Sequence, residues 1–127
     1  MPIRIVRLGS PRAPGEGARI GAVRRPPRSV PRQQIAPHWY DVWYPNLAPS
    51  PETVKLAQAA QTPGEWAAFT RRYRREMATP DNRHTLALLA QLSRQTDFSV
   101  GCYCADEAHC HRSVLRALLT EAGAQIG

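Results

Sequence analysis

The sequence has no long apolar run, a single lysine and only three cysteines. Its longest uninterrupted apolar stretch spans residues 86–90, far short of the about 20 residues that a helix needs to cross a bilayer. The arginine-rich beginning has no apolar segment of the kind found in secretory signals. Three cysteines, two of them one residue apart, are a poor basis for a disulfide framework, so we expect free thiols. These absences indicate a cytoplasmic protein without a membrane span.

The length of 127 residues suits one domain, because domains usually contain about 100–150 residues. A content of 43% hydrophobic and 21% charged residues is typical of a globular chain and excludes the disordered and fibrous classes. We therefore expect residues 1–127 to form a single domain with one core.

All of the net charge of +7 lies in the first third of the chain. Residues 1–37 contain eight arginines and one glutamate, whereas the basic and acidic groups of residues 38–127 cancel. A local excess of arginine attracts phosphates and nucleic acids, because binding them releases counterions. A GC-rich genome would also favour arginine over lysine, so charge alone makes a nucleotide or nucleic-acid partner a hypothesis.

Three segments have the apolar pattern of strands, namely residues 1–8, 18–24 and 97–103. Turn-forming residues fill positions 9–17, and four prolines between positions 26 and 37 exclude regular structure there. We expect a long loop that ends in an aromatic cluster. This cluster either anchors the loop to the core or stacks on nucleic-acid bases; it consists of Trp39, Tyr40, Trp43 and Tyr44.

A serine or threonine followed by proline marks three helix starts, at Ser50, Thr62 and Thr79. The second helix has an apolar stripe as far as Met77, and we interpret the arginines on its other side as a solvated face or as an extension of a phosphate-binding surface. These arginines are Arg71, Arg72, Arg74 and Arg75. A further helix is predicted over residues 110–121. Strand, helices, strand and helix in this order are typical of an α/β fold, so we predict one small α/β domain with a mostly parallel sheet flanked by helices.

Residues 102–113 place three thiols, two imidazoles and an arginine where the last strand meets the last helix. Ligands of open α/β sheets bind beyond the carboxyl ends of the strands. The first turn of a helix offers backbone N–H groups and partial positive charge to an anion. We therefore expect an anion site that uses Arg112 and Ser113, with Tyr73 as a polar side chain in its lining.

The second predicted strand ends in Arg-Arg-Pro-Pro-Arg, which contributes Arg24 and Arg28. Guanidinium groups on a loop made rigid by proline suit the bidentate recognition of phosphate, and a solvated loop is the alternative interpretation. If the second and last strands are parallel neighbours, this loop and the start of the last helix converge on one side of the sheet.

Two other chemistries fit the same region. Cys110 beside His111 at a helix N-terminus is a setting in which a thiol becomes nucleophilic, with the imidazole as general base. Cys102, Cys104 and Cys110 with His109 or His111 are ligand types that zinc prefers, although the spacing differs from the common Cys-x₂₋₄-Cys. Cysteines that fill a buried strand end are the simplest interpretation of Cys102 and Cys104, and no cofactor is predicted.

The order of these motifs resembles the family catalogued as domain of unknown function 488. The similarity spans roughly residues 3–120 and includes Arg-x-Pro-Pro-Arg at 24–28, Leu-Ala-Pro-Ser at 47–50, Arg-Tyr-x-x-Glu at 72–76 and Cys-His-Arg at 110–112. The resemblance implies a small bacterial or archaeal α/β domain whose signature positions are the arginine loop and the Cys-His-Arg helix start, with no established reaction. Many relatives have Asp-Val-Arg where this chain has Ala22-Val23-Arg24, so no mechanism that needs an acid at residue 22 is implied.

The sequence thus leads to three hypotheses. The first is a module that binds a nucleotide, nucleic acid or other phosphate-bearing ligand through the arginine loop and the start of the last helix. The second is an enzyme that acts on a nucleotide or a nucleic-acid base through Cys110 and His111. The third is a metal or redox module built on the cysteines.

Overall fold

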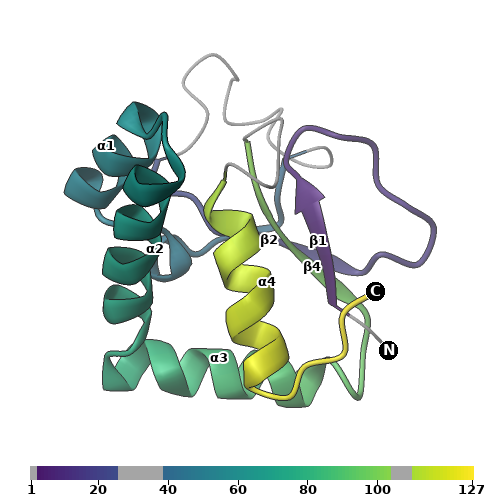
Figure 1. The fold of residues 1–127 in the computed structure, drawn as a ribbon. Coiled ribbons are helices and arrows are strands. Elements are labelled where there is room, and N and C mark those ends of the chain that lie inside the picture. The colour runs from purple at the N-terminus through teal and green to yellow at the C-terminus, as the bar shows by residue number, and fades with distance from the viewer. Residues whose placement is uncertain (1–2, 26–38, 104–109) are drawn as a thin grey trace.

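The computed structural model describes residues 3–25, 39–103 and 110–127 (Figure 1). Within these residues, parallel strands form one four-stranded sheet in the order β1-β4-β2-β3. The strands are β1 (Ile3–Arg7), β2 (Ala18–Gly21), β3 (Val42–Trp43) and β4 (Phe98–Cys102). The predicted α/β class with a parallel sheet is confirmed, and β2 and β4 are direct neighbours.

Each Ser/Thr-Pro signal starts a helix. The helices are α1 (Pro51–Ala59), α2 (Pro63–Met77), α3 (Pro80–Leu92) and α4 (His111–Glu121), and a short 3-10 helix, η2 (Pro45–Leu47), precedes α1. The hydroxyls of Ser50 and Thr62 accept hydrogen bonds from backbone N–H groups of the first helical turn, as N-cap residues do. The Thr79 hydroxyl instead donates to the Glu76 carbonyl at 3.3 Å.

Two details of the sheet differ from the sequence prediction. The second strand ends at Gly21 rather than at Arg24, although the N–H of Ala22 still donates to the carbonyl of Gly101 at 2.9 Å. In addition, β3 lies where only loop was expected, and it pairs with β2 so that Val42 lies beside Ile20. A strand of two residues is too short for an alternating pattern to reveal it.

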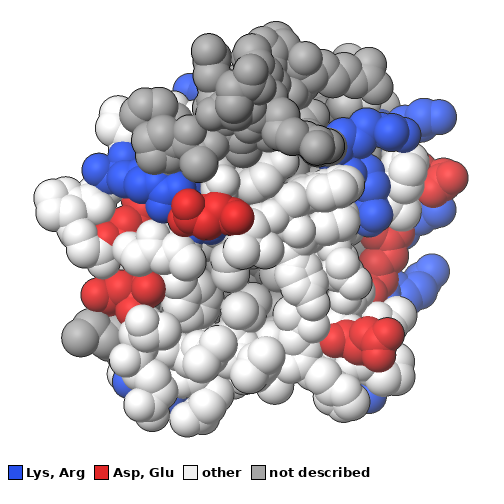
Figure 2. All heavy atoms as spheres, turned by 180° about the vertical axis from the view of Figure 1, so that it is seen from behind, with Lys and Arg blue, Asp and Glu red and all other residues white. Residues whose placement is uncertain are grey.

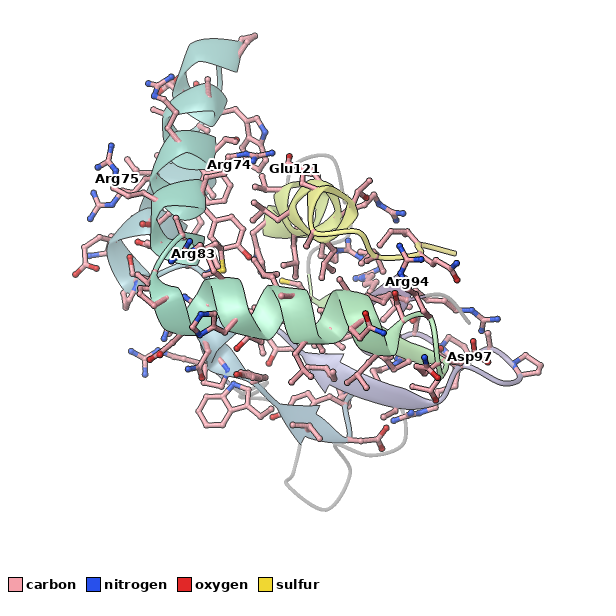
Figure 3. All side chains as sticks on the ribbon, turned by 90° about the horizontal axis from the view of Figure 1, so that it is seen from below. Arg74, Arg75, Arg83, Arg94, Asp97 and Glu121 are labelled. Carbon is pink, nitrogen blue, oxygen red and sulfur yellow. The ribbon has the colours of Figure 1, made fainter. Side chains whose placement is uncertain are left out.

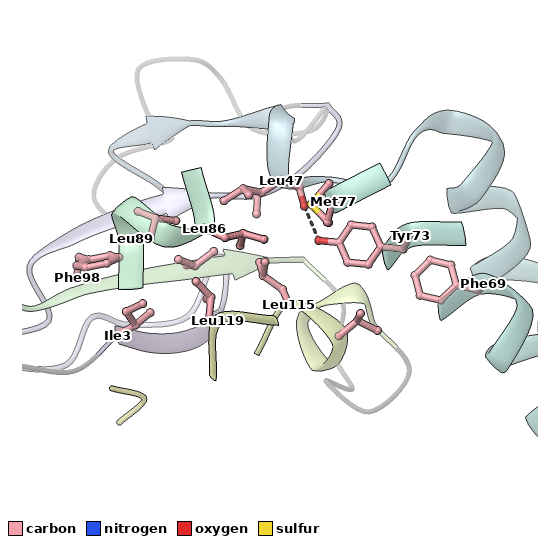
Figure 4. Packing of buried hydrophobic residues seen from close by; sticks show 13 residues of the cluster. Ile3, Leu47, Phe69, Tyr73, Met77, Leu86, Leu89, Phe98, Leu115 and Leu119 are labelled. Carbon is pink, nitrogen blue, oxygen red and sulfur yellow. Dashed lines mark hydrogen bonds between the residues drawn. The ribbon is translucent and has the colours of Figure 1, made fainter. Parts of the chain in front are cut away.

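Helices α3 and α4 lie against one face of the sheet, with α4 in front of it and α3 below it in Figure 1, and α1 packs against α2 beside them. This packing follows from the apolar stripes of α2, α3 and α4, which meet the alternate apolar side chains of β1 and β4. The main core (Figure 4) includes Ile3, Leu47, Phe69, Tyr73, Met77, Leu86, Leu89, Phe98, Val100, Leu115 and Leu119.

The other face of the sheet contains a buried ion pair. Arg19 and Ser99 are register partners on neighbouring strands, so both side chains leave the face opposite to Phe98 and Val100. The guanidinium of Arg19 donates to both oxygens of Glu16, at 2.7 and 2.9 Å, and Ser99 adds a third hydrogen bond to this carboxylate at 2.7 Å. These bonds, that from Arg19 above all, lower the pKa of Glu16 to about 2 despite its burial.

This ion pair anchors residues 9–17 to the sheet. Arg19 has no exposed surface, and its Nη1 also donates to the carbonyl of Ser10 at 2.9 Å. A second ion pair, between Arg12 and Asp41 at 2.8 Å, ties the same segment to the residues just before β3. Arg19, which the charge count placed in a basic field, is therefore neutralised inside the fold.

Candidate functional site

The parallel pairing of β2 and β4 brings the two predicted motifs to one edge of the sheet. Gly21, the last residue of β2, is the register partner of Gly101, so β4 extends only one residue further, to Cys102. Ala22, which follows β2, and His111, which begins α4, meet there with 2.7 Å between the backbone oxygen of Ala22 and Nε2 of His111. The end of β2 and the start of α4 therefore meet at the carboxyl edge of the sheet, whereas the convergence of the whole arginine loop stays a prediction because residues 26–38 lie outside the described residues.

Cys110 and His111 lie in contact at the start of α4. Cys110 is the N-cap residue and has extended backbone angles, which turn the chain into the helix. The distance between Sγ of Cys110 and Nδ1 of His111 is 3.8 Å. Because a carbonyl oxygen only accepts hydrogen bonds, the Ala22 carbonyl selects the tautomer in which Nε2 bears the proton. The lone pair of Nδ1 then faces the Cys110 sulfur.

A second thiol lies beside this pair. Cys102 is the last residue of β4, and its sulfur, the Cys110 sulfur and a ring nitrogen of His111 all lie within 4.8 Å of one another. The three residues are 5%, 2% and 8% exposed, respectively. In the described part of the chain this is the one group of three or more Cys, His, Asp or Glu side chains that lies close enough to share a metal ion.

Apolar and aromatic side chains surround the two thiols. Leu8, Val23 and Tyr40 form a buried cluster with Cys102 and Cys110, against which Trp39 and Tyr103 pack. The rings of Trp39 and Tyr103 meet edge to face, with centroids 5.6 Å apart. The aromatic residues at the end of the predicted loop thus pack on the site, while base stacking by them stays a prediction.

Gly9 permits this packing. It has a positive φ of 92°, and a Cβ at this position would come within 3.2 Å of the Trp39 ring. The turn after β1 therefore lets the Trp39 ring approach the backbone closely beside the thiol cluster.

Tyr73, which was expected in the lining of an anion site, packs against His111 of the Cys-His pair. Its ring meets the His111 ring edge to face with centroids 5.6 Å apart, and its hydroxyl donates to the Leu47 carbonyl at 2.5 Å (Figure 4). Complete burial, and then the nearby thiols, raise the pKa of Tyr73 well above its ordinary value. Tyr73 is therefore a neutral donor whose hydroxyl is used within the fold.

Arg24, the first arginine of the predicted phosphate loop, binds the turn between η2 and α1. Its Nε donates to the carbonyl of Pro49 and its Nη2 to the carbonyl of Ala48, both at 3.0 Å. With the bond from Tyr73 to Leu47, side chains hold three successive carbonyls of this turn. The Leu-Ala-Pro-Ser motif therefore positions the wall of the site, a role that the sequence reasoning did not assign.

Glu76 completes this network. Its carboxylate accepts hydrogen bonds from the Ser50 N–H at 2.9 Å, the Ser50 hydroxyl at 2.7 Å and the Thr53 hydroxyl at 2.6 Å. Burial alone would raise the pKa of Glu76, but these hydrogen bonds outweigh it and lower the pKa. The Arg-Tyr-x-x-Glu motif was the only sequence signal that Tyr73 and Glu76 act together on the turn before α1, because it places both on one face of α2.

The remaining predicted residues divide into two sets. Arg112 is 4% exposed, and the hydroxyl of Ser113 donates to the Cys110 carbonyl at 3.0 Å, so both lie at the buried start of α4. Arg28, Cys104 and His109 lie outside the described residues, so their predicted roles stay predictions. Of the two imidazoles named for a metal site, the described one, His111, lies close to the thiols.

The arginines of α2 are mainly a solvated face, as one of the two interpretations held. Arg71, Arg72 and Arg75 are exposed, and Arg74 pairs with Glu121 of α4 at 2.9 Å (Figure 3). On the face shown in Figure 2, Lys and Arg atoms form one group on the left and one on the right, each next to the grey atoms. Among the described residues, exposed arginines thus lie on α2 as well as shortly after β2.

Comparison with known proteins adds the family. Among the described helices, none has the length and apolar character that crossing a bilayer requires. No curated protein and no solved structure shows significant similarity to the chain. The family model described as the active DUF488-N3 subclade matches residues 3–123, and the chain therefore belongs to this branch of the DUF488 family.

Proposed function

We propose that the chain is an enzyme that acts on a nucleotide or another phosphate-bearing substrate, with Cys110 as nucleophile and His111 as general base. One observation supports this proposal above all. The His111 ring is fixed by the Ala22 carbonyl at Nε2, so its Nδ1 faces the Cys110 sulfur 3.8 Å away. A nucleophile, a base and a group that orients the base are the three components of a thiol-based active site.

We propose that His111 and the start of α4 offset the desolvation that burial imposes on a Cys110 thiolate. Nδ1 of His111 accepts the thiol proton, and the imidazolium that forms keeps its Nε2–H bond to the Ala22 carbonyl. Cys110 caps α4, where the backbone N–H groups and the helix dipole stabilise negative charge. Both effects lower the cost of separating the proton from the sulfur.

The proposed substrate class follows from charge. The start of α4 is suited to an anion, and the exposed Arg25 follows β2 at the same edge of the sheet. The sequence places the whole excess of +7 in residues 1–37. Arg24 contributes less to this charge than the sequence suggested, because its guanidinium holds the turn before α1.

A substrate screen tests the proposal. The purified chain is incubated with nucleoside mono-, di- and triphosphates and with short single-stranded DNA and RNA, and release of free base and inorganic phosphate is measured. We expect turnover that Cys110→Ser abolishes and that His111→Asn lowers by about 10²–10⁴-fold, the usual contribution of a general base. His84→Asn, on the exposed surface of α3, is the matched control and should keep full activity. Turnover that survives both site variants, or binding without turnover, would contradict the enzyme proposal.

A zinc centre is the second candidate, and the position of Cys102 supports it. Zinc prefers thiolate and imidazole ligands, and bond lengths of about 2.0–2.3 Å place tetrahedral ligands about 3.3–3.8 Å apart. The separation of 3.8 Å between Cys110 and His111 fits that geometry. A backbone carbonyl on the other ring nitrogen, as at Ala22, is a common partner of a metal-binding histidine.

Metal analysis separates the two candidates. Zinc at about one atom per chain, lost in Cys102→Ser, would favour the metal centre. Metal-free protein with undiminished stability and a reactive Cys110 would favour the enzyme.

A further inference from the structure

Two buried thiols on different elements lie within reach of each other. Cys102 ends β4 and Cys110 caps α4, and their sulfurs are at most 4.8 Å apart. A disulfide needs a sulfur separation of about 2.0 Å, so its formation requires the side chains to rotate and bring the two sulfurs closer together. The catalytic proposal assigns a role to Cys110 and none to Cys102.

We propose that Cys110 is an oxidation site for hydroperoxides and that Cys102 is its resolving thiol. This inference extends the proposed function, because the sulfur that oxidation would block is the proposed nucleophile. The proximity of the two sulfurs supports the inference: Cys102 is the only other cysteine among the described residues, and its sulfur lies within 4.8 Å of the Cys110 sulfur.

The chemistry balances with hydrogen peroxide as the oxidant. The Cys110 thiolate attacks one peroxide oxygen, the O–O bond breaks, and the leaving hydroxide takes the proton held by His111 to form water. The Cys102 thiol then attacks the sulfur of the sulfenic acid, an S–S bond forms, and the hydroxyl leaves as a second water with the Cys102 proton. Two sulfurs are oxidised, the peroxide is reduced to two waters, and a dithiol reverses the bond.

The surroundings favour a disulfide over further oxidation. Both thiols lie in the buried cluster with Leu8, Val23 and Tyr40, and they are 5% and 2% exposed. The end of β4 is fixed by the hydrogen bond from the Leu8 N–H to the Cys102 carbonyl at 2.8 Å. Cys102 is therefore held at the position from which it reaches Cys110 before a second peroxide does.

The test uses a Cys104→Ser chain, so that only the two described thiols remain. Peroxide should lower the mass of this variant by two hydrogen atoms and leave no sulfenic acid for dimedone to trap. Dithiothreitol should restore the original mass. In the Cys102→Ser, Cys104→Ser control, Cys110 should instead react with dimedone or gain two oxygens. A Cys104→Ser chain that stays reduced, or that reaches the sulfinic acid with Cys102 intact, would overturn the inference.

Turnover separates this inference from the enzyme proposal. Turnover of the Cys104→Ser chain should be lost after mild peroxide treatment and restored by dithiothreitol, because the disulfide blocks the Cys110 sulfur reversibly. A disulfide that forms in a chain without turnover would refute the enzyme proposal and leave the oxidation site standing. Turnover without any disulfide would refute the oxidation site and leave the enzyme proposal standing.

Discussion

The buried ion pair of Glu16 and Arg19 gives a stability prediction that follows directly from its geometry. Glu16 is 3% exposed and accepts two hydrogen bonds from the guanidinium and one from Ser99. A carboxyl whose pKa falls from 4.5 to about 2 on folding contributes about 3 kcal/mol to stability at neutral pH. Glu16→Gln keeps the shape but leaves Arg19 buried without its counter-charge, so we expect a loss of about 3 kcal/mol.

The pH dependence of this loss is more diagnostic than its size. The folded state has the lower pKa, so the contribution of Glu16 is complete above about pH 4.5 and is lost as pH falls toward about 2. The difference in stability between wild type and Glu16→Gln should therefore shrink over this range. Other carboxylates titrate there too, but they are common to both chains and cancel in the difference.

Urea unfolding followed by tryptophan fluorescence measures both quantities, at about pH 7 and at about pH 3. Glu52→Gln is the matched control, because Glu52 is exposed on α1 and its replacement should change stability by less than about 0.5 kcal/mol. A loss below about 1 kcal/mol for Glu16→Gln at neutral pH, or a difference that does not shrink in acid, would refute the assigned function of the ion pair.

Three further predictions concern the site and its wall. Tyr73→Phe should cost about 1 kcal/mol in urea unfolding, because the Leu47 carbonyl loses its buried donor; no loss would mean that the turn does not need this bond. Arg24→Ala should cost about 1–2 kcal/mol while Arg25→Ala, on the exposed neighbour, costs less than about 0.5 kcal/mol; equal losses would contradict the structural function of Arg24. Nitrogen-15 NMR of neutral His111 should show a proton on Nε2 and none on Nδ1, and the opposite tautomer would contradict the orientation of the ring.

Local signals predicted the helices well. The Ser/Thr-Pro pairs at Ser50, Thr62 and Thr79 each precede a helix, because capping and the fixed φ of proline act within a few residues. The helix ends have no comparable signal: α1 stops at Ala59 and α3 at Leu92. Such boundaries depend on tertiary packing, which no local pattern specifies.

Long-range contacts explain what the sequence did not reveal. An arginine in a strand suggested surface charge, yet Arg19 is fully buried because Glu16 and Ser99 come to it from a loop and from β4. In the same way, Arg24 suggested phosphate binding, but carbonyls about 25 positions later in the chain use its donors. The sequence identifies both residues as charged, but only the fold shows which groups their guanidinium groups bind.

For the site, topology was predictable and the chemistry of its contacts was not. The α/β order predicted that the end of β2 and the start of α4 share an edge on the condition that β2 and β4 are parallel neighbours, and the structure meets this condition. The Ala22 carbonyl orients His111, but the sequence could not predict this contact, because every residue has the same backbone carbonyl. Cys102 was assigned to a zinc set on residue type alone, and the structure adds its distance to the other two ligands.

The most direct test of the central claim is the alkylation rate of Cys110 in a Cys102→Ser, Cys104→Ser chain. Iodoacetamide reacts with the thiolate, so its rate across pH reports how strongly His111 and the start of α4 favour that form. We predict that His111→Asn lowers the rate near neutral pH by about tenfold or more, while His84→Asn leaves it unchanged. Equal rates in the parent chain and in His111→Asn would contradict the proposed Cys-His pair.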